Sequence, residues 1–167
     1  MARKDNSKKT NAMRELERAG VDYSVLSYDD DGERGHELGV HIAELLNKDP
    51  DTCFKTLVCT AASGGHVACC IPVAYELDLK KAAAALGEKS LSMLPLKELE
   101  TVTGYVRGAC TPLALKKPLP TLIDESALLF DEISISAGKH GYSLVLNAEK
   151  LGEHLGTIFA DITREVQ

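Results

Sequence analysis

Tryptophan is absent from this 167-residue chain, and aromatic residues make up only 5% of it. The hydrophobic core must therefore be built mainly from Leu, Val, Ile and Ala side chains. No apolar run reaches the roughly 20 residues that a helix needs to cross a bilayer. The first residues are polar and basic, with no apolar segment resembling a signal peptide behind them. These absences predict a cytoplasmic protein.

The cysteines exclude two further kinds of chemistry. There are five, an odd number, and none forms a Cys-x-x-Cys pair of the kind that binds zinc or exchanges disulfides. They all lie in apolar segments that are typical of strands: Cys53, Cys59, Cys69, Cys70 and Cys110. We therefore expect buried free thiols in a reducing compartment.

Common catalytic and cofactor motifs are also missing. The sequence has no Gly-x-Ser-x-Gly elbow, no Walker phosphate loop and no His-Glu-x-x-His pattern. The acidic run at residues 29–33 lacks the spacing of a calcium loop. The net charge of −6 is opposite to that of most proteins that hold nucleic acid through its phosphates. We expect no metal and no cofactor, and any nucleic-acid partner would be held locally or with help from another protein.

The order of secondary-structure signals shows no internal repeat and no interdomain linker. Residues 1–9 are rich in lysine and arginine and contain no core residue, which predicts a flexible basic tail before one domain, residues 10–167. Helices are expected at residues 11–19, 36–47, 79–86, 95–102 and 148–155. Strands are expected at residues 21–28, 53–59, 66–73, 90–93, 121–124, 131–136, 142–146 and 157–162. This mixture predicts an α/β fold with a mixed sheet that could close into a barrel.

Two of these elements carry a more detailed expectation. In the helix at residues 36–47, the leucines and the isoleucine are expected to face inward: Leu38, Ile42, Leu45 and Leu46. The strand at residues 131–136 alternates strictly between polar and apolar residues, which predicts that only one of its faces is buried.

A lysine inside an apolar strand is the first candidate for chemistry. The strand reads Cys-Phe-Lys-Thr-Leu-Val-Cys, and alternation places Lys55 on the face opposite to Phe54 and Thr56. A lysine in such a position either extends to solvent at the end of the sheet or lines a pocket.

Two glycine-bounded loops are the second candidate. Gly104 and Gly108 bracket the first loop, and Gly138 and Gly141 bracket the second. Glycine permits turns that other residues resist, and it lets a ligand approach backbone N–H groups closely. These loops are either plain turns or, if both face the lysine strand, the walls of a pocket for a small anionic or carbonyl group.

Together these segments resemble the YbaK/ProX family of bacterial aminoacyl-tRNA deacylases over residues 11–162. The resemblance rests on the following motifs: Tyr28-Asp29, Phe54-Lys55-Thr56-Leu57, Leu77-Asp78-Leu79-Lys80-Lys81, Thr103-Gly104-Tyr105-Val106-Arg107-Gly108, Thr111-Pro112-Leu113 and Gly138-Lys139-His140-Gly141. It implies a barrel-like mixed sheet surrounded by helices. It also implies hydrolysis of the ester that joins a wrong amino acid to the 3′ adenosine of tRNA, without a metal, a cofactor or a protein nucleophile.

The free-standing YbaK branch is the most similar, which implies Cys-tRNA(Pro) as the substrate. The substrate's ribose hydroxyl or cysteine thiol would assist the cleavage. Prolyl-tRNA synthetase bound to the same tRNA would be a partner. A non-catalytic module that uses the same pocket to bind an aminoacyl or nucleotide ligand, or to regulate a synthetase, is the alternative.

The resemblance also implies roles for individual residues. Lys55 matches the active-site lysine, and Tyr28, Thr56, Gly108 and Ser136 match positions that line the aminoacyl pocket. Gly108 would contribute its backbone N–H, which suits a carbonyl oxygen.

This chain departs from the family pattern at three positions. Ala109 stands where a second glycine is common, and Ala137 where the second loop usually has Gly-Gly-Lys. Ser143, which we also expect to bind substrate, stands where the cysteine-specific branch has an aspartate.

Overall fold

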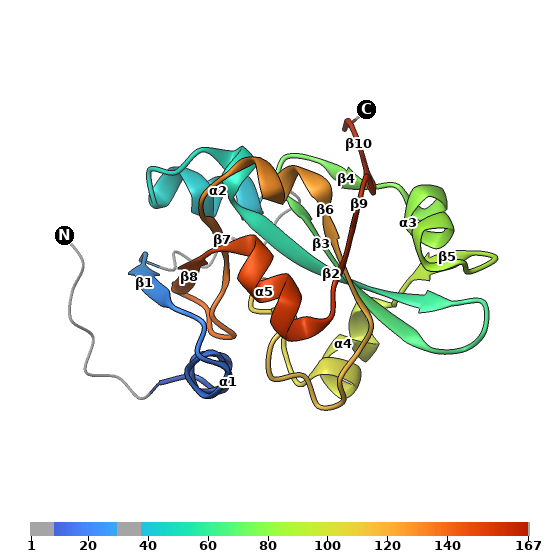
Figure 1. Ribbon diagram of the computed structural model, residues 1–167, viewed down its shortest axis with the longest axis horizontal. Coiled ribbons are helices and arrows are strands. Elements are labelled where there is room, and N and C mark those ends of the chain that lie inside the picture. Colours follow the sequence, from blue (N-terminus) through green and yellow to red (C-terminus); the bar gives the residue numbers. More distant parts are fainter. Residues whose placement is uncertain (1–8, 30–37, 167) are drawn as a thin grey trace.

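The computed structural model describes residues 9–29 and 38–166. Most of the predicted basic tail, the acidic run from residue 30 onward and the first residues of the predicted second helix lie outside the described residues. Figure 1 shows an α/β arrangement in which helices pack around a long central hairpin. The expected α/β class is confirmed.

The larger sheet is mixed and contains the strand with Lys55. Its strand order is β5-β2-β3-β6-β9. The members are β5 (Leu91–Met93), β2 (Phe54–Ala61), β3 (His66–Pro72), β6 (Thr121–Asp124) and β9 (Ile158–Ala160). Strands β2 and β3 form the predicted antiparallel hairpin, whereas β6 runs parallel to β3 and β9 runs parallel to β6.

A second sheet of three antiparallel strands faces the beginning of β2. It has the order β1-β8-β7 and consists of β1 (Tyr23–Ser27), β8 (Tyr142–Leu146) and β7 (Ile133–Ser136). An isolated parallel bridge between Cys53 and Ser134 links it to the larger sheet. The short strands β4 (Glu76–Leu77) and β10 (Thr163–Arg164) form a separate antiparallel pair. The expected mixed sheet is therefore divided into parts that contact each other beside β2.

The helices begin and end largely where the sequence predicts, because their capping residues act locally. They are α1 (Asn11–Ala19), α2 (Leu38–Leu45), α3 (Leu79–Leu86), α4 (Leu96–Thr103) and α5 (Ala148–Leu155). Thr10 caps α1 by accepting a hydrogen bond from the Met13 N–H, and Asp78 caps α3 in the same way. Gly20 ends α1 in the left-handed conformation at φ +71°.

Some local expectations are wrong, for reasons of packing. Leu45, expected to face inward, is 44% exposed, because Ala43 rather than Leu45 is the buried residue of α2. The strand β7 is buried on both faces instead of one, since its serine side also lies against neighbouring elements. Two 3-10 helices were not expected: η1 (Pro50–Thr52), where a turn was predicted, and η2 (Glu125–Leu129).

The core has two main parts that together hold the sheets in place. One lies between the three-stranded sheet, α1 and α5, and includes Leu16, Ile135, Leu144 and Leu151. The other lies between the larger sheet and α3. All five cysteines are buried free thiols, as predicted. No helix in the described ranges combines the length and apolar character needed to cross a lipid bilayer.

Candidate active site

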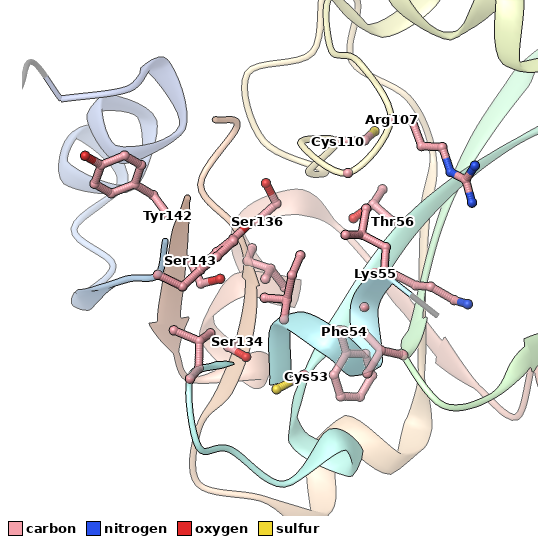
Figure 2. A pocket seen from close by; sticks show the side chains of 18 of the residues that line it. Cys53, Phe54, Lys55, Thr56, Arg107, Cys110, Ser134, Ser136, Tyr142 and Ser143 are labelled. Atoms are coloured by element: carbon pink, nitrogen blue, oxygen red, sulfur yellow. The ribbon is translucent and has the colours of Figure 1, made fainter. Parts of the chain in front are cut away.

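A cavity of about 280 Å³ lies between α2, the first half of β2, the loop after α4 and the pair β7–β8 (Figure 2). All of the residues singled out from the sequence lie on its wall: Tyr28, Lys55, Thr56, Gly108, Ser136 and Ser143. These residues come from distant parts of the chain, and the fold brings them together at one place. Their individual roles in substrate binding and catalysis stay predictions.

Lys55 forms one side of this cavity together with a second cation, Arg107. Figure 2 shows the ammonium of Lys55 and the guanidinium of Arg107 on the same side of the site, away from the serines of β7 and β8. Lys55 is half-buried, and burial lowers its pKa from the ordinary value. Nearby Glu76 raises the pKa and Arg107 lowers it further. This side of the cavity is therefore suited to an anionic group.

Backbone groups add a second kind of donor. Gly108 has φ +86°, a conformation that favours glycine. Its N–H forms no hydrogen bond within the described part of the chain. The C=O of Val58 accepts from the Leu94 N–H on the edge of β2 that faces β5. By the two-residue period of a strand, the N–H and C=O of Thr56 point to this same edge of β2. Strand β5 pairs with β2 only at residues 59–61, so it does not cover these groups of Thr56. Gly108 and Thr56 can therefore offer backbone hydrogen bonds to a ligand.

Ser136 lies on the cavity wall, but its hydroxyl already has two partners within the protein. Its hydroxyl donates a hydrogen bond to the C=O of Ala109 at 2.8 Å. The same oxygen accepts from the N–H of Gly138 at 3.1 Å. Because a serine has only one hydroxyl proton, Ser136 can accept from a ligand but has no proton left to donate. Its hydroxyl joins the two glycine loops.

Two other serines on the same face have free hydroxyls. Ser134 precedes Ser136 by two residues in β7, and Ser143 lies opposite Ser136 in β8, so all three share one face. Ser134 is 6% exposed and Ser143 is 7% exposed. Neither hydroxyl has a hydrogen-bond partner among the described residues. Ser134 was not among the sequence candidates, although the alternation Ile-Ser-Ile-Ser already placed it on the face of Ser136.

The two glycine loops pack against each other through close contacts. A Cβ atom at Gly108 would lie 2.8 Å from His140 Cε1, and one at Gly138 would lie 2.9 Å from Tyr105 Cε1. The hydroxyl of Tyr105 donates to the C=O of Leu113 at 2.7 Å. The first loop lines the cavity through Arg107 and Gly108, and the second loop packs behind it. This favours the pocket interpretation for the first loop.

Two thiols reach the cavity wall, Cys53 and Cys110. Burial raises the pKa of Cys110 to about 12, so its thiol is protonated and unreactive at neutral pH. The described residues contain no group of three or more His, Cys, Asp or Glu side chains that could hold a metal ion. What the arrangement supplies is a set of cations, backbone donors and hydroxyls that can orient and polarise an ester.

Comparison with known proteins identifies the family. Residues 37–153 match the aminoacyl-tRNA editing domain. The chain belongs to the aminoacyl-tRNA editing domain family. A protein of Enterococcus faecalis, EbsC, described as a candidate Cys-tRNA(Pro)/Cys-tRNA(Cys) deacylase, is 41% identical over 163 residues, which cover 98% of either chain.

Solved structures of low sequence identity share the fold. The crystal structure of the hypothetical protein APE2540 superposes with a TM-score of 0.82 at 21% identity, covering 93% of this chain and 100% of that one. A candidate trans-editing enzyme for prolyl-tRNA synthetase superposes with a TM-score of 0.78 at 23% identity, covering 95% of this chain and 99% of that one. The editing-domain fold and the aminoacyl-tRNA deacylase class expected from the sequence are thus confirmed.

Proposed function

We propose that this editing-domain protein hydrolyses the ester bond of mischarged tRNA(Pro), with Cys-tRNA(Pro) as its main substrate. The observation that carries this proposal is a small cavity that combines a half-buried lysine, Arg107 and the unpaired N–H of Gly108. The description of EbsC as a candidate Cys-tRNA(Pro)/Cys-tRNA(Cys) deacylase supports the same substrate.

The cavity suits an aminoacyl ester at the end of a nucleic acid. Its volume of about 280 Å³ is close to the lower limit of about 300 Å³ for typical ligand pockets. That space fits a small amino acid and the adjoining part of a ribose, while the rest of the tRNA stays outside. Lys55 and Arg107 would bind the anionic 3′ end, and the N–H of Gly108 would polarise the ester carbonyl.

The chemistry would rely on positioning rather than on a covalent enzyme intermediate. An aminoacyl ester is already activated, so correct orientation lowers much of its barrier to hydrolysis. A ribose hydroxyl or the thiol of the bound amino acid would assist the cleavage. Because the chain has a net charge of −6, a prolyl-tRNA synthetase on the same tRNA would supply part of the affinity in the cytoplasm.

Single-turnover deacylation of tRNA(Pro) charged with cysteine, alanine or proline tests this proposal. We expect fast hydrolysis of Cys-tRNA(Pro), slower hydrolysis of Ala-tRNA(Pro) and none of Pro-tRNA(Pro) above the uncatalysed rate. Tight binding of charged tRNA without any hydrolysis would instead support a non-catalytic binding module. Addition of prolyl-tRNA synthetase to the same assay tests the partner, since a ternary complex would raise the rate at low enzyme concentration.

A further inference from the structure

The face shared by β7 and β8 carries two hydroxyls that the proposed positioning chemistry does not use. Ser134 and Ser143 are more than nine-tenths buried, line the cavity and have no hydrogen-bond partner among the described residues. Their oxygen atoms are not among the fully buried side-chain oxygens that lack a partner, so each hydroxyl opens onto the cavity. Two neighbouring hydroxyls that open onto the cavity, and that the described part of the chain does not occupy, are available to hydrogen-bond a ligand there.

The location of the Ser134 and Ser143 hydroxyls relative to the two cationic side chains determines which part of a substrate these hydroxyls would contact. In Figure 2 the hydroxyls of Ser134 and Ser143 point into the cavity from the side opposite to Lys55 and Arg107, and Thr56 lies between. The anionic nucleic acid would be held at the cationic side. The end of the substrate farthest from the phosphates, which is the amino-acid side chain, then lies at the serine side.

The chemistry of this side selects a neutral polar group. A serine hydroxyl can donate and accept, and neither Ser134 nor Ser143 carries a charge. Cys53, whose backbone forms the isolated β-bridge with Ser134, adds a buried thiol beside them. The free hydroxyls would thus pair with one small group that also donates and accepts, such as a thiol or hydroxyl on the substrate Cβ.

We propose that Ser134, together with Ser143, determines specificity by hydrogen-bonding the side-chain thiol or hydroxyl of the bound aminoacyl group. This inference rests on the proposed function, and it adds the residues that distinguish a cysteinyl or seryl group from an alanyl group of similar size. Ser136 cannot take this role as a donor, because its proton is held by Ala109.

Binding of non-hydrolysable analogues tests the inference separately from catalysis. The probes are 3′-amino-3′-deoxyadenosine carrying cysteine, serine or alanine in amide linkage, titrated calorimetrically under reducing conditions. We expect the parent to bind the cysteinyl and seryl amides more tightly than the alanyl amide. Ser134→Ala should reduce that preference about fivefold, the scale of one lost hydrogen bond, with the alanyl affinity changed less than about twofold.

Matched variants make the outcome decisive. Ser143→Ala should weaken the same preference, and Ser92→Ala, which removes an exposed hydroxyl from β5, should not change it. An equal loss of affinity for all the probes, or an unchanged preference in Ser134→Ala and Ser143→Ala, would overturn this inference. A lost preference in Ser134→Ala combined with no hydrolysis of any charged tRNA by the parent would support this inference and overturn the deacylase proposal alone.

Discussion

The hydroxyl of Ser136 donates to the backbone C=O of Ala109 at 2.8 Å, and this contact ties β7 to the loop that contains Gly108. The same oxygen accepts from the N–H of Gly138 at 3.1 Å, so one side chain fixes both glycine loops. Ser136, which is predicted to line the substrate pocket, thus also links two parts of the cavity wall.

Ser136→Ala should therefore reduce both stability and turnover. The change leaves the C=O of Ala109 and the N–H of Gly138 without their partner, which should cost about 1–3 kcal/mol of unfolding free energy. Urea unfolding gives the stability, and single-turnover deacylation gives the rate. Ser136→Thr keeps the hydroxyl and should recover most of both. Unchanged stability in Ser136→Ala would show that this link does not hold the loops.

Gly108→Ala should disturb the cavity by a steric mechanism. A Cβ atom at this position would lie 2.8 Å from His140 Cε1 and 2.9 Å from Leu38 Cδ2, at a backbone φ of +86°. The backbone strain alone should cost about 1–3 kcal/mol. Gly64→Ala is the matched control, because Gly64 also has positive φ, +103°, but no heavy atom within 4 Å of its Cβ position.

Both glycine variants should therefore lose stability through backbone strain, and Gly108→Ala should lose more because of its added steric contacts, as measured by thermal unfolding. Only Gly108→Ala should lose deacylation, because only it shifts the wall that offers the Gly108 N–H. Equal activity in the two folded variants would count against a role for this loop in catalysis.

Cys110→Ala should keep its activity although Cys110 lines the cavity. Burial holds the pKa of this thiol at about 12, so almost no thiolate exists at neutral pH. We expect the single-turnover rate to stay within a few-fold of the parent, and the same for Cys69→Ala, whose thiol lies in the core away from the cavity. A loss of more than about a hundredfold in folded Cys110→Ala, the scale of a lost catalytic group, would mean that the thiol takes part in the chemistry.

Removal of residues 2–8 should weaken tRNA binding mainly at low salt. These residues are basic, whereas the chain as a whole carries −6. Contacts between basic residues and phosphates are screened as salt increases. Deacylation measured over a salt series should show a shallower salt dependence in the truncated protein, with an unchanged melting temperature. A variant with Arg3, Lys4 and Lys8 replaced by glutamine should behave like the truncation; a salt dependence identical to the parent in both proteins would refute this role.

Much of the fold follows from local signals in the sequence. The caps at Thr10 and Asp78, the stop at Gly20 and the apolar run of β2 depend on near neighbours, so they predict their elements well. The cavity residues could be identified from the sequence because they match positions in the family motifs, although they lie far apart along the chain.

Other features depend on packing between distant segments, which no local pattern encodes. The exposure of Leu45 reflects which face of α2 meets the rest of the protein. The burial of Ser134 depends on the bridge that places β7 beside Cys53. Likewise, the contact between Ser136 and Ala109 joins residues that are separated by 27 positions. Only the folded chain shows that the hydroxyl of Ser136 is hydrogen-bonded within the described residues, whereas the hydroxyls of Ser134 and Ser143 are not.

The stability of Lys55 variants supplies the folding control for the central claim. Burial lowers the pKa of Lys55, so its charged form is less favourable in the folded protein than in the unfolded chain. That cost is present at pH values below the lowered pKa and disappears as the pH rises past the ordinary value of 10.5. Lys55→Ala and Lys55→Met should therefore melt at or above the parent temperature at pH 7.

Single-turnover deacylation of Cys-tRNA(Pro) by Lys55→Ala tests most directly whether this cavity is the active site. If Lys55 holds the 3′ end and stabilises developing charge, its removal should lower the rate by about a hundredfold or more. Lys55→Arg should recover little, because a planar guanidinium does not replace a compact ammonium in a tight site. Hydrolysis near the parent rate by folded Lys55→Ala would contradict the account and would place the chemistry elsewhere.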